Sequence, residues 1–119
     1  MNEELKKQFS EAVKLKEEGQ LESAKKMFVD LAEKEPKSTA IFAVLGHVCY
    51  DMGALEEAVK VFKRAVELSP ALEGVSLGLF HSLWKLGRQV EALEEAKRFQ
   101  SNSDSEDYRE IIREINEKW

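Results

Sequence analysis

The feature that most constrains this chain is an internal repeat with a period of 34 residues. Residues 17–36 align with residues 51–70 without a gap. The recurring pairs are Gly19 and Gly53, Ala24 and Ala58, Phe28 and Phe62, and Pro36 and Pro70. A repeat of this length is one supersecondary unit, which cannot bury its apolar face alone and does so by stacking on its neighbours.

A third copy continues the same interval in weaker form. It keeps Gly87 and Ala92, but it has Ala96 where phenylalanine is expected and Asp104 where proline is expected. Terminal units of stacked repeats are usually atypical because one of their faces meets solvent. We therefore interpret the chain as three copies of one unit, of which the middle copy is the most regular.

The apolar residues of the middle copy indicate two helices joined by a turn. In 39–52, positions 42, 45, 46 and 49 fall on one narrow arc of a helix, and the apolar residues of 55–68 form a similar stripe. Gly53 separates the two segments, and glycine ends a helix in the left-handed region at little steric cost. Each repeat is then a pair of antiparallel helices.

This pattern resembles the tetratricopeptide repeat family, whose signature has a large residue, Leu-Gly, an aromatic residue, Ala-x3-Phe and proline at fixed spacings. The middle copy matches it with Phe42, Leu45, Gly46, Cys49, Ala58, Phe62, Ala65 and Pro70, and departs from it at Cys49, where tyrosine is usual. The resemblance implies an all-α fold, a right-handed superhelical α-solenoid of antiparallel helix pairs. It implies one domain over 1–119, with repeats at about 5–38, 39–72 and 73–104 and a capping helix at about 105–119.

The final segment predicts one more amphipathic helix. Its apolar face consists of Tyr108, Ile111, Ile112, Ile115 and Trp119. We expect this helix to cover the open end of the stack and keep it soluble. The same pattern also fits a helix that binds a partner, so this alternative stays open.

A second stripe on the first helix of each repeat lies apart from the apolar arc. In the family that the chain resembles, these positions face a concave groove that holds a partner peptide. The resemblance therefore implies a partner-binding groove formed by Phe9, Val13, Lys16, His47, Tyr50, Leu77, His81, Trp84 and Lys85. On this register His47 is expected beside His81, and Tyr50 beside Trp84. An alternative places Trp84 under the terminal helix.

The sequence offers little for chemistry. Zinc requires three or four ligands, and two histidines 34 residues apart do not supply them, so we expect no metal and no cofactor. Cys49 is predicted to face the core, where a thiol is a poor nucleophile. We find no general-base constellation and no phosphate-binding loop, so we expect no enzyme and assign no catalytic residue.

Charge and composition narrow the choice of partners. The formal net charge is −5, and no basic cluster free of glutamate occurs, which argues against nucleic acid. We recognise no secretory signal and no membrane span, and a single cysteine suits a reducing compartment, so a cytoplasmic location is expected.

The predicted function is a non-enzymatic protein–protein interaction module that holds a segment of a partner protein in its groove. The alternative is a small protein of the immunity or antitoxin type, which neutralises a cognate toxin by occlusion. A steep dependence of binding on salt would favour that alternative. Self-association through the ends of the stack stays open.

Overall fold

The computed structural model describes residues 1–118, and these residues form seven helices and no strand. The helices are α1 (Glu3–Glu17), α2 (Leu21–Lys34), α3 (Thr39–Asp51), α4 (Leu55–Leu68), α5 (Glu73–Lys85), α6 (Gln89–Gln100) and α7 (Glu106–Lys118). The all-α solenoid expected from the repeat is confirmed. Trp119, which the sequence placed on the apolar face of the last helix, lies outside the described residues.

The predicted turns recur with the period of the sequence. Gly19, Gly53 and Gly87 have φ angles of 81°, 77° and 81°, in the left-handed region that favours glycine. The residue after each glycine donates its backbone N–H to a carbonyl five positions earlier, at 2.9 Å in all three copies. This pattern closes the end of the first helix of each pair and reverses the chain into the second helix.

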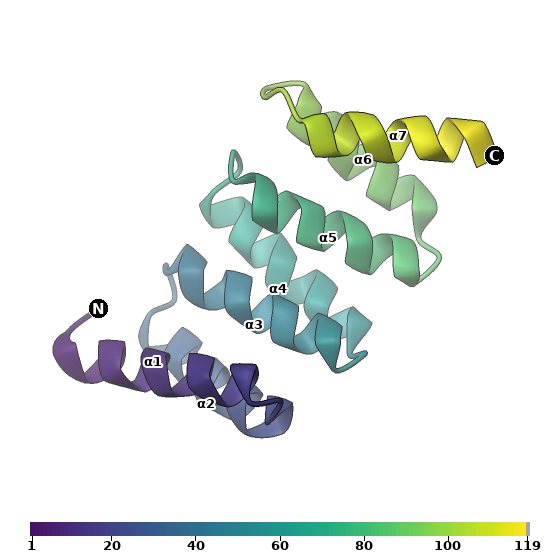
Figure 1. Ribbon diagram of the computed structural model, residues 1–119. Helices are drawn as coiled ribbons and strands as arrows, with labels where there is room; N and C mark the ends of the chain where they lie inside the picture. Colours follow the sequence, from purple (N-terminus) through teal and green to yellow (C-terminus); the bar gives the residue numbers. More distant parts are fainter. Residues whose placement is uncertain (119) are drawn as a thin grey trace.

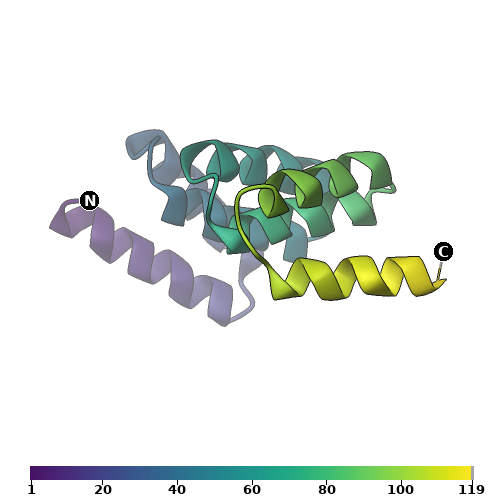
Figure 2. The ribbon, with the colours of Figure 1, turned by 90° about the horizontal axis from the view of Figure 1, so that it is seen from above.

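The helices form two layers (Figure 1). The first helix of each pair lies in one layer together with α7, and α2, α4 and α6 lie in the other. Successive pairs stack along a molecule that measures 47 × 27 × 20 Å. Seen from above, α1 and α7 lie along the same side of the molecule at its two ends (Figure 2). No helix within residues 1–118 is long and apolar enough to cross a membrane.

The core explains why the third repeat departs from the first two. Phe62 of α4 is fully buried and lies against the backbone of Gly46 on α3 and Gly78 on α5. In the third pair the sizes are reversed: the buried Phe80 is on the first helix and the buried Ala96 is on the second. The phenylalanine missing from the expected position is thus replaced in the core by one on the facing helix.

An arginine on the second helix anchors the preceding loop in two of the repeats. Arg64 of α4 donates a hydrogen bond of 3.2 Å to the carbonyl of Pro36, and Arg98 of α6 donates one of 3.2 Å to the carbonyl of Pro70. The two arginines are 34 positions apart, as are the two prolines. The repeat was recognised from the prolines and not from these arginines.

Helix α7 packs against the stack through one buried aromatic side chain and a network of hydrogen bonds. Tyr108 is fully buried, and its ring lies 5.6 Å from that of Phe80 and 5.7 Å from that of Phe99. Its hydroxyl lies 2.7 Å from the hydroxyl of Ser76 on α5, which donates to the carboxylate of Glu95 on α6 at 2.6 Å. Three helices therefore meet at one hydrogen-bonded point.

Candidate binding groove

A cavity of about 370 Å³ opens between α3 and α5, on the layer formed by the first helices. We call it the central groove; it is lined by His47, Tyr50, Phe62, Gly74, Leu77, Gly78 and His81. The lining is mostly apolar and aromatic, and its polar groups are two imidazoles and the Tyr50 hydroxyl. Such a surface suits an apolar side chain flanked by a few polar contacts.

Glycines on α5 give the central groove its depth. At Gly74 an added Cβ would meet nothing within 4 Å, so the absence of a side chain leaves open space. At Gly78 the ring of Phe62 fills the space that a side chain would occupy and forms the floor of the groove. His47 stands over this floor, with its ring edge-on to Phe62 at 5.0 Å.

A basic residue covers the aromatic wall at one side. The ammonium of Lys85 on α5 lies 4.9 Å from the centre of the Tyr50 ring on α3. This cation–π contact holds a partly buried tyrosine in place and leaves a positive charge beside the groove. Tyr50 and Lys85 are two of the residues that the sequence placed on the binding surface.

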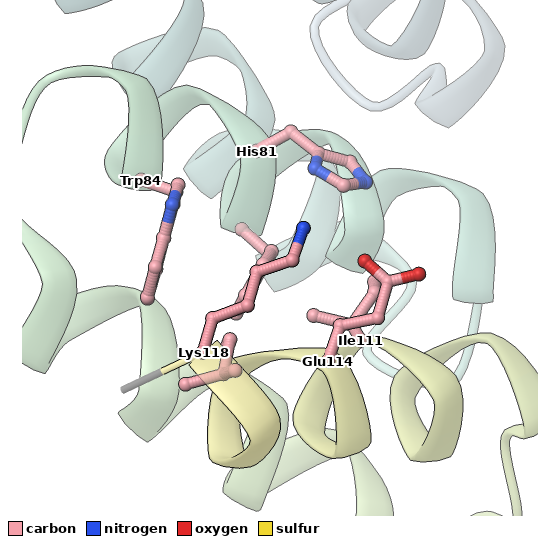
Figure 3. A pocket seen from close by; sticks show the side chains of 7 residues that line it. His81, Trp84, Ile111, Glu114 and Lys118 are labelled. Atoms are coloured by element: carbon pink, nitrogen blue, oxygen red, sulfur yellow. The ribbon is translucent and has the colours of Figure 1, made fainter.

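Two further clefts open between α5 and α7. The tryptophan cleft, of about 230 Å³, is lined by Phe80, His81, Trp84, Ile111, Glu114, Ile115 and Lys118. Figure 3 shows Glu114 and Lys118 extending from α7 toward His81 and Trp84 on α5. Within it the Trp84 ring stacks on that of Phe80 at 5.7 Å and an interplanar angle of 14°.

The other opening, the acidic cleft, has a volume of about 240 Å³ and is lined by Leu77, His81, Asp107, Glu110, Ile111 and Glu114. His81 lines this cleft, the tryptophan cleft and the central groove. Leu77 is shared by the acidic cleft and the central groove. The three openings are therefore adjacent parts of one surface, with His81 at their junction.

The two imidazoles are favoured in their neutral form. Desolvation by the groove walls lowers the pKa of His47 and of His81. At His47, Asp51 acts in the opposite direction, while the charge of Lys16 lowers the pKa further. Neutral imidazoles have one donor and one acceptor nitrogen each, so both can bind a peptide backbone.

The single cysteine of the chain lies in the core. Cys49 is 1% exposed, and burial raises the pKa of its thiol. No group of three or more metal-ligating side chains converges anywhere in residues 1–118.

The structure brings together four of the residues predicted for the groove: His47, Tyr50, Leu77 and His81 line one cavity. Trp84 lies on the other side of His81, where it faces α7 rather than Tyr50. The predicted residues of α1 lie further along the layer. Phe9 packs edge-on against Phe28 at 5.7 Å, and Val13 and Lys16 are partly buried.

Sequence reasoning missed the acidic wall that α7 contributes. Helix α7 begins at Glu106, which is 33 residues after the start of α5 at Glu73 rather than 34. With that offset, the stripe at positions 74, 77, 81 and 84 corresponds to positions 107, 110, 114 and 117, all of which are acidic. Alignment of the last helix at its own offset would have revealed this wall.

A family model described as tetratricopeptide repeat matches residues 15–67. Solved structures of the same fold include a MamA mutant, with a TM-score of 0.78, 22% identity, and coverage of 87% of this chain and 76% of that one. They also include MamA from AMB-1, with a TM-score of 0.77 and 23% identity, of which this chain spans 57%.

A third similar structure is the type III secretion chaperone SycD of Yersinia enterocolitica, in complex with a peptide of the translocator YopD. Its TM-score is 0.82 at 18% identity, and the alignment covers 98% of this chain and 90% of SycD. No curated protein matches the sequence.

Proposed function

We propose that this chain, whose residues 15–67 match the tetratricopeptide repeat model, is a non-enzymatic interaction module that captures a segment of a partner protein in the central groove. The observation that carries the proposal is the groove itself: an apolar and aromatic hollow on the layer of first helices, floored by Phe62. Desolvation favours the neutral form of the two imidazoles at its wall. The one cysteine is buried with a raised pKa, which leaves no activated nucleophile there.

The fold supports peptide capture. The SycD structure contains a bound peptide and covers nearly the whole of this chain. At 18% identity the likeness is one of fold, so the surface that binds in this chain is argued from its own residues. Here the residues are His47, Tyr50, Leu77 and His81, which belong to two neighbouring repeats and converge on one space.

The groove is suited to an apolar anchor residue. A cavity of about 370 Å³ accommodates one or two large side chains, and the edges of both imidazoles and the Tyr50 hydroxyl offer hydrogen bonds at its rim. Aromatic residues at the centre of an interface supply much of its binding energy. Truncation of Tyr50 should therefore cost about 2 kcal/mol of binding, which is roughly a thirtyfold loss of affinity.

The direct test is to fill the groove without disturbing the fold. The position for this is Gly74, where a new side chain meets open space. Gly74→Leu should fold normally and lose the partner that wild type captures from its native cell, whereas Gly74→Ala should retain most of the binding. Tyr50→Ala should weaken capture as well.

Retention of the partner by both Gly74→Leu and Tyr50→Ala would refute groove capture. If that retained binding also fell steeply with salt, it would favour the neutralising protein described above, which acts through its charged outer surface. Mass spectrometry of the proteins that remain bound to each variant, at low and at high salt, separates these results.

A further inference from the structure

We propose that the groove selects partner segments in which an apolar anchor is followed, about three residues away, by lysine or arginine that docks on the acidic wall of α7. This inference rests on the proposed function and specifies its ligand. It assigns α7 a role in recognition, in addition to covering the end of the stack.

The first observation is the placement of the carboxylates. Asp107, Glu110 and Glu114 face Leu77 and His81 across the acidic cleft. All three are exposed, and none of them forms an ion pair with any residue of the described part of the chain, 1–118. A cationic side chain that entered this cleft would be attracted by the unpaired carboxylates along α7.

The second observation is that this arrangement is unfavourable in the free protein. Asp107 and Glu110 are three residues apart on one helix, and Glu110 and Glu114 are four apart, so each pair repels. A fourth acid, Glu117, continues the row toward the C-terminal end of α7, where the helix dipole disfavours negative charge. A bound cation would relieve this repulsion, and this electrostatic complementarity favours a basic ligand.

The third observation is continuity with an apolar site. The acidic cleft shares Leu77 and His81 with the central groove, so one ligand can occupy both. The two openings lie on either side of α5, and packed helices are spaced at about 10 Å. An extended chain advances about 3.4 Å per residue, so roughly three residues separate the anchor from the cation.

Two basic groups lie on the side of the central groove away from α7. Lys16 of α1 lies close enough to His47 to lower its pKa, and Lys85 covers the Tyr50 ring. The basic groups therefore lie at the α1 and α3 side of the central groove, while the acidic wall lies beyond α5. A bound segment should therefore place its basic residue toward α7, because the reverse orientation would bring that residue close to Lys16 and Lys85.

The test uses a displayed library of random twelve-residue peptides, selected on the wild-type chain. The variant Asp107→Asn, Glu110→Gln, Glu114→Gln removes three charges from the acidic wall. A matched control, Glu22→Gln, Glu33→Gln, Glu94→Gln, removes three exposed charges from α2 and α6 in the other layer. Gly74→Leu reports whether a peptide uses the central groove.

The expected result is that groove-dependent peptides carry lysine or arginine close to an apolar residue. Exchange of that cation for glutamine should weaken binding about two- to fivefold at 50 mM salt. The acidic-wall variant should lose this discrimination, and the matched control should keep it. At 500 mM salt the difference should shrink severalfold because exposed charges are screened.

Three results would overturn the inference, and they are distinguishable. Groove-dependent peptides without a basic preference would leave the proposed function standing and remove the role of α7. Peptides that bind equally well to Gly74→Leu would refute the proposed function, and the inference with it. A basic preference that the matched control also loses would show a general effect of net charge and would likewise overturn the assignment to α7.

Discussion

The ring of Phe62 on α4 lies against the backbone of Gly78 on α5, so closely that a Cβ at position 78 would lie 2.4 Å from the ring. The same ring approaches Gly46 on α3, where the corresponding distance is 2.7 Å. One buried side chain thus sets the spacing of two neighbouring first helices and also forms the floor of the groove between them.

Gly78→Ala should therefore destabilise the protein although alanine is the better helix former. The clash with a fully buried ring outweighs the gain in helix propensity of about 1 kcal/mol, so we expect a net loss of about 2 kcal/mol in the free energy of unfolding. Urea denaturation measures it. Gly74→Ala is the control, since its new methyl group meets open space. Equal stability of the two variants would contradict this packing.

The two recurring arginines should differ in importance. Arg98 and Arg64 both donate to a proline carbonyl, and each pairs with a glutamate three residues away. Glu95, the partner of Arg98 at 2.7 Å, is only 8% exposed, whereas Glu67, the partner of Arg64, is exposed. Arg98→Ala leaves the Glu95 carboxylate without its charged partner and should cost about 2 kcal/mol, whereas Arg64→Ala should cost under about 1 kcal/mol. Urea denaturation of both variants measures the two losses of stability. A larger loss for Arg64→Ala than for Arg98→Ala would contradict the prediction.

The hydroxyl of Tyr108 should control how firmly α7 is held. Burial raises the pKa of this phenol, so the group stays protonated and its bond to Ser76 persists through the neutral range. Tyr108→Phe keeps the ring but removes that hydrogen bond, at a cost of about 1 kcal/mol. Hydrogen exchange should show faster exchange in α7 and unchanged protection in α3 and α4. A uniform effect over all helices would argue against a local fastening.

Acidification should weaken the fold before its carboxylates titrate. The pKa values of His47 and His81 are lowered in the folded state, so the unfolded chain binds more protons below its own histidine pKa of about 6.5. Stability should be constant above that pH and fall as the pH drops through the folded-state values. Melting temperatures at pH 7.5 and pH 5.5 test this.

The matching control is the His47→Gln, His81→Gln variant, which should lose less stability over the same interval. Proton NMR of the imidazoles gives both folded-state pKa values directly. Values above 6.5 would contradict desolvation as their cause.

Much of the fold follows from local pattern. Apolar residues at helical spacing define each helix, and Gly19, Gly53 and Gly87 end the first helix of each pair because glycine enters the left-handed region at little steric cost. Both signals act within one repeat, and the 34-residue period carries them from copy to copy. The stacked pairs and the place of α7 at the end of the stack could therefore be predicted.

The detailed surface could not be predicted in this way. Three features depend on contacts between side chains on different helices. They are the exchange of large and small residues at Phe80 and Ala96, the polar network around Ser76, and the contact of Lys85 with Tyr50. Such contacts depend on how far and at what angle two helices approach, and no spacing along the chain encodes that.

By itself, then, the sequence determined the helices, their turns and their stacking, since these arise from backbone geometry and from apolar stripes that must be buried. Only the tertiary structure decided which space stays open. Helix α7 begins one residue early relative to the repeat, and this small offset rotates Tyr108 into the core and Glu110 toward Leu77. A helix turns by about 100° per residue, so a shift of one position changes which side chains form the wall of the groove.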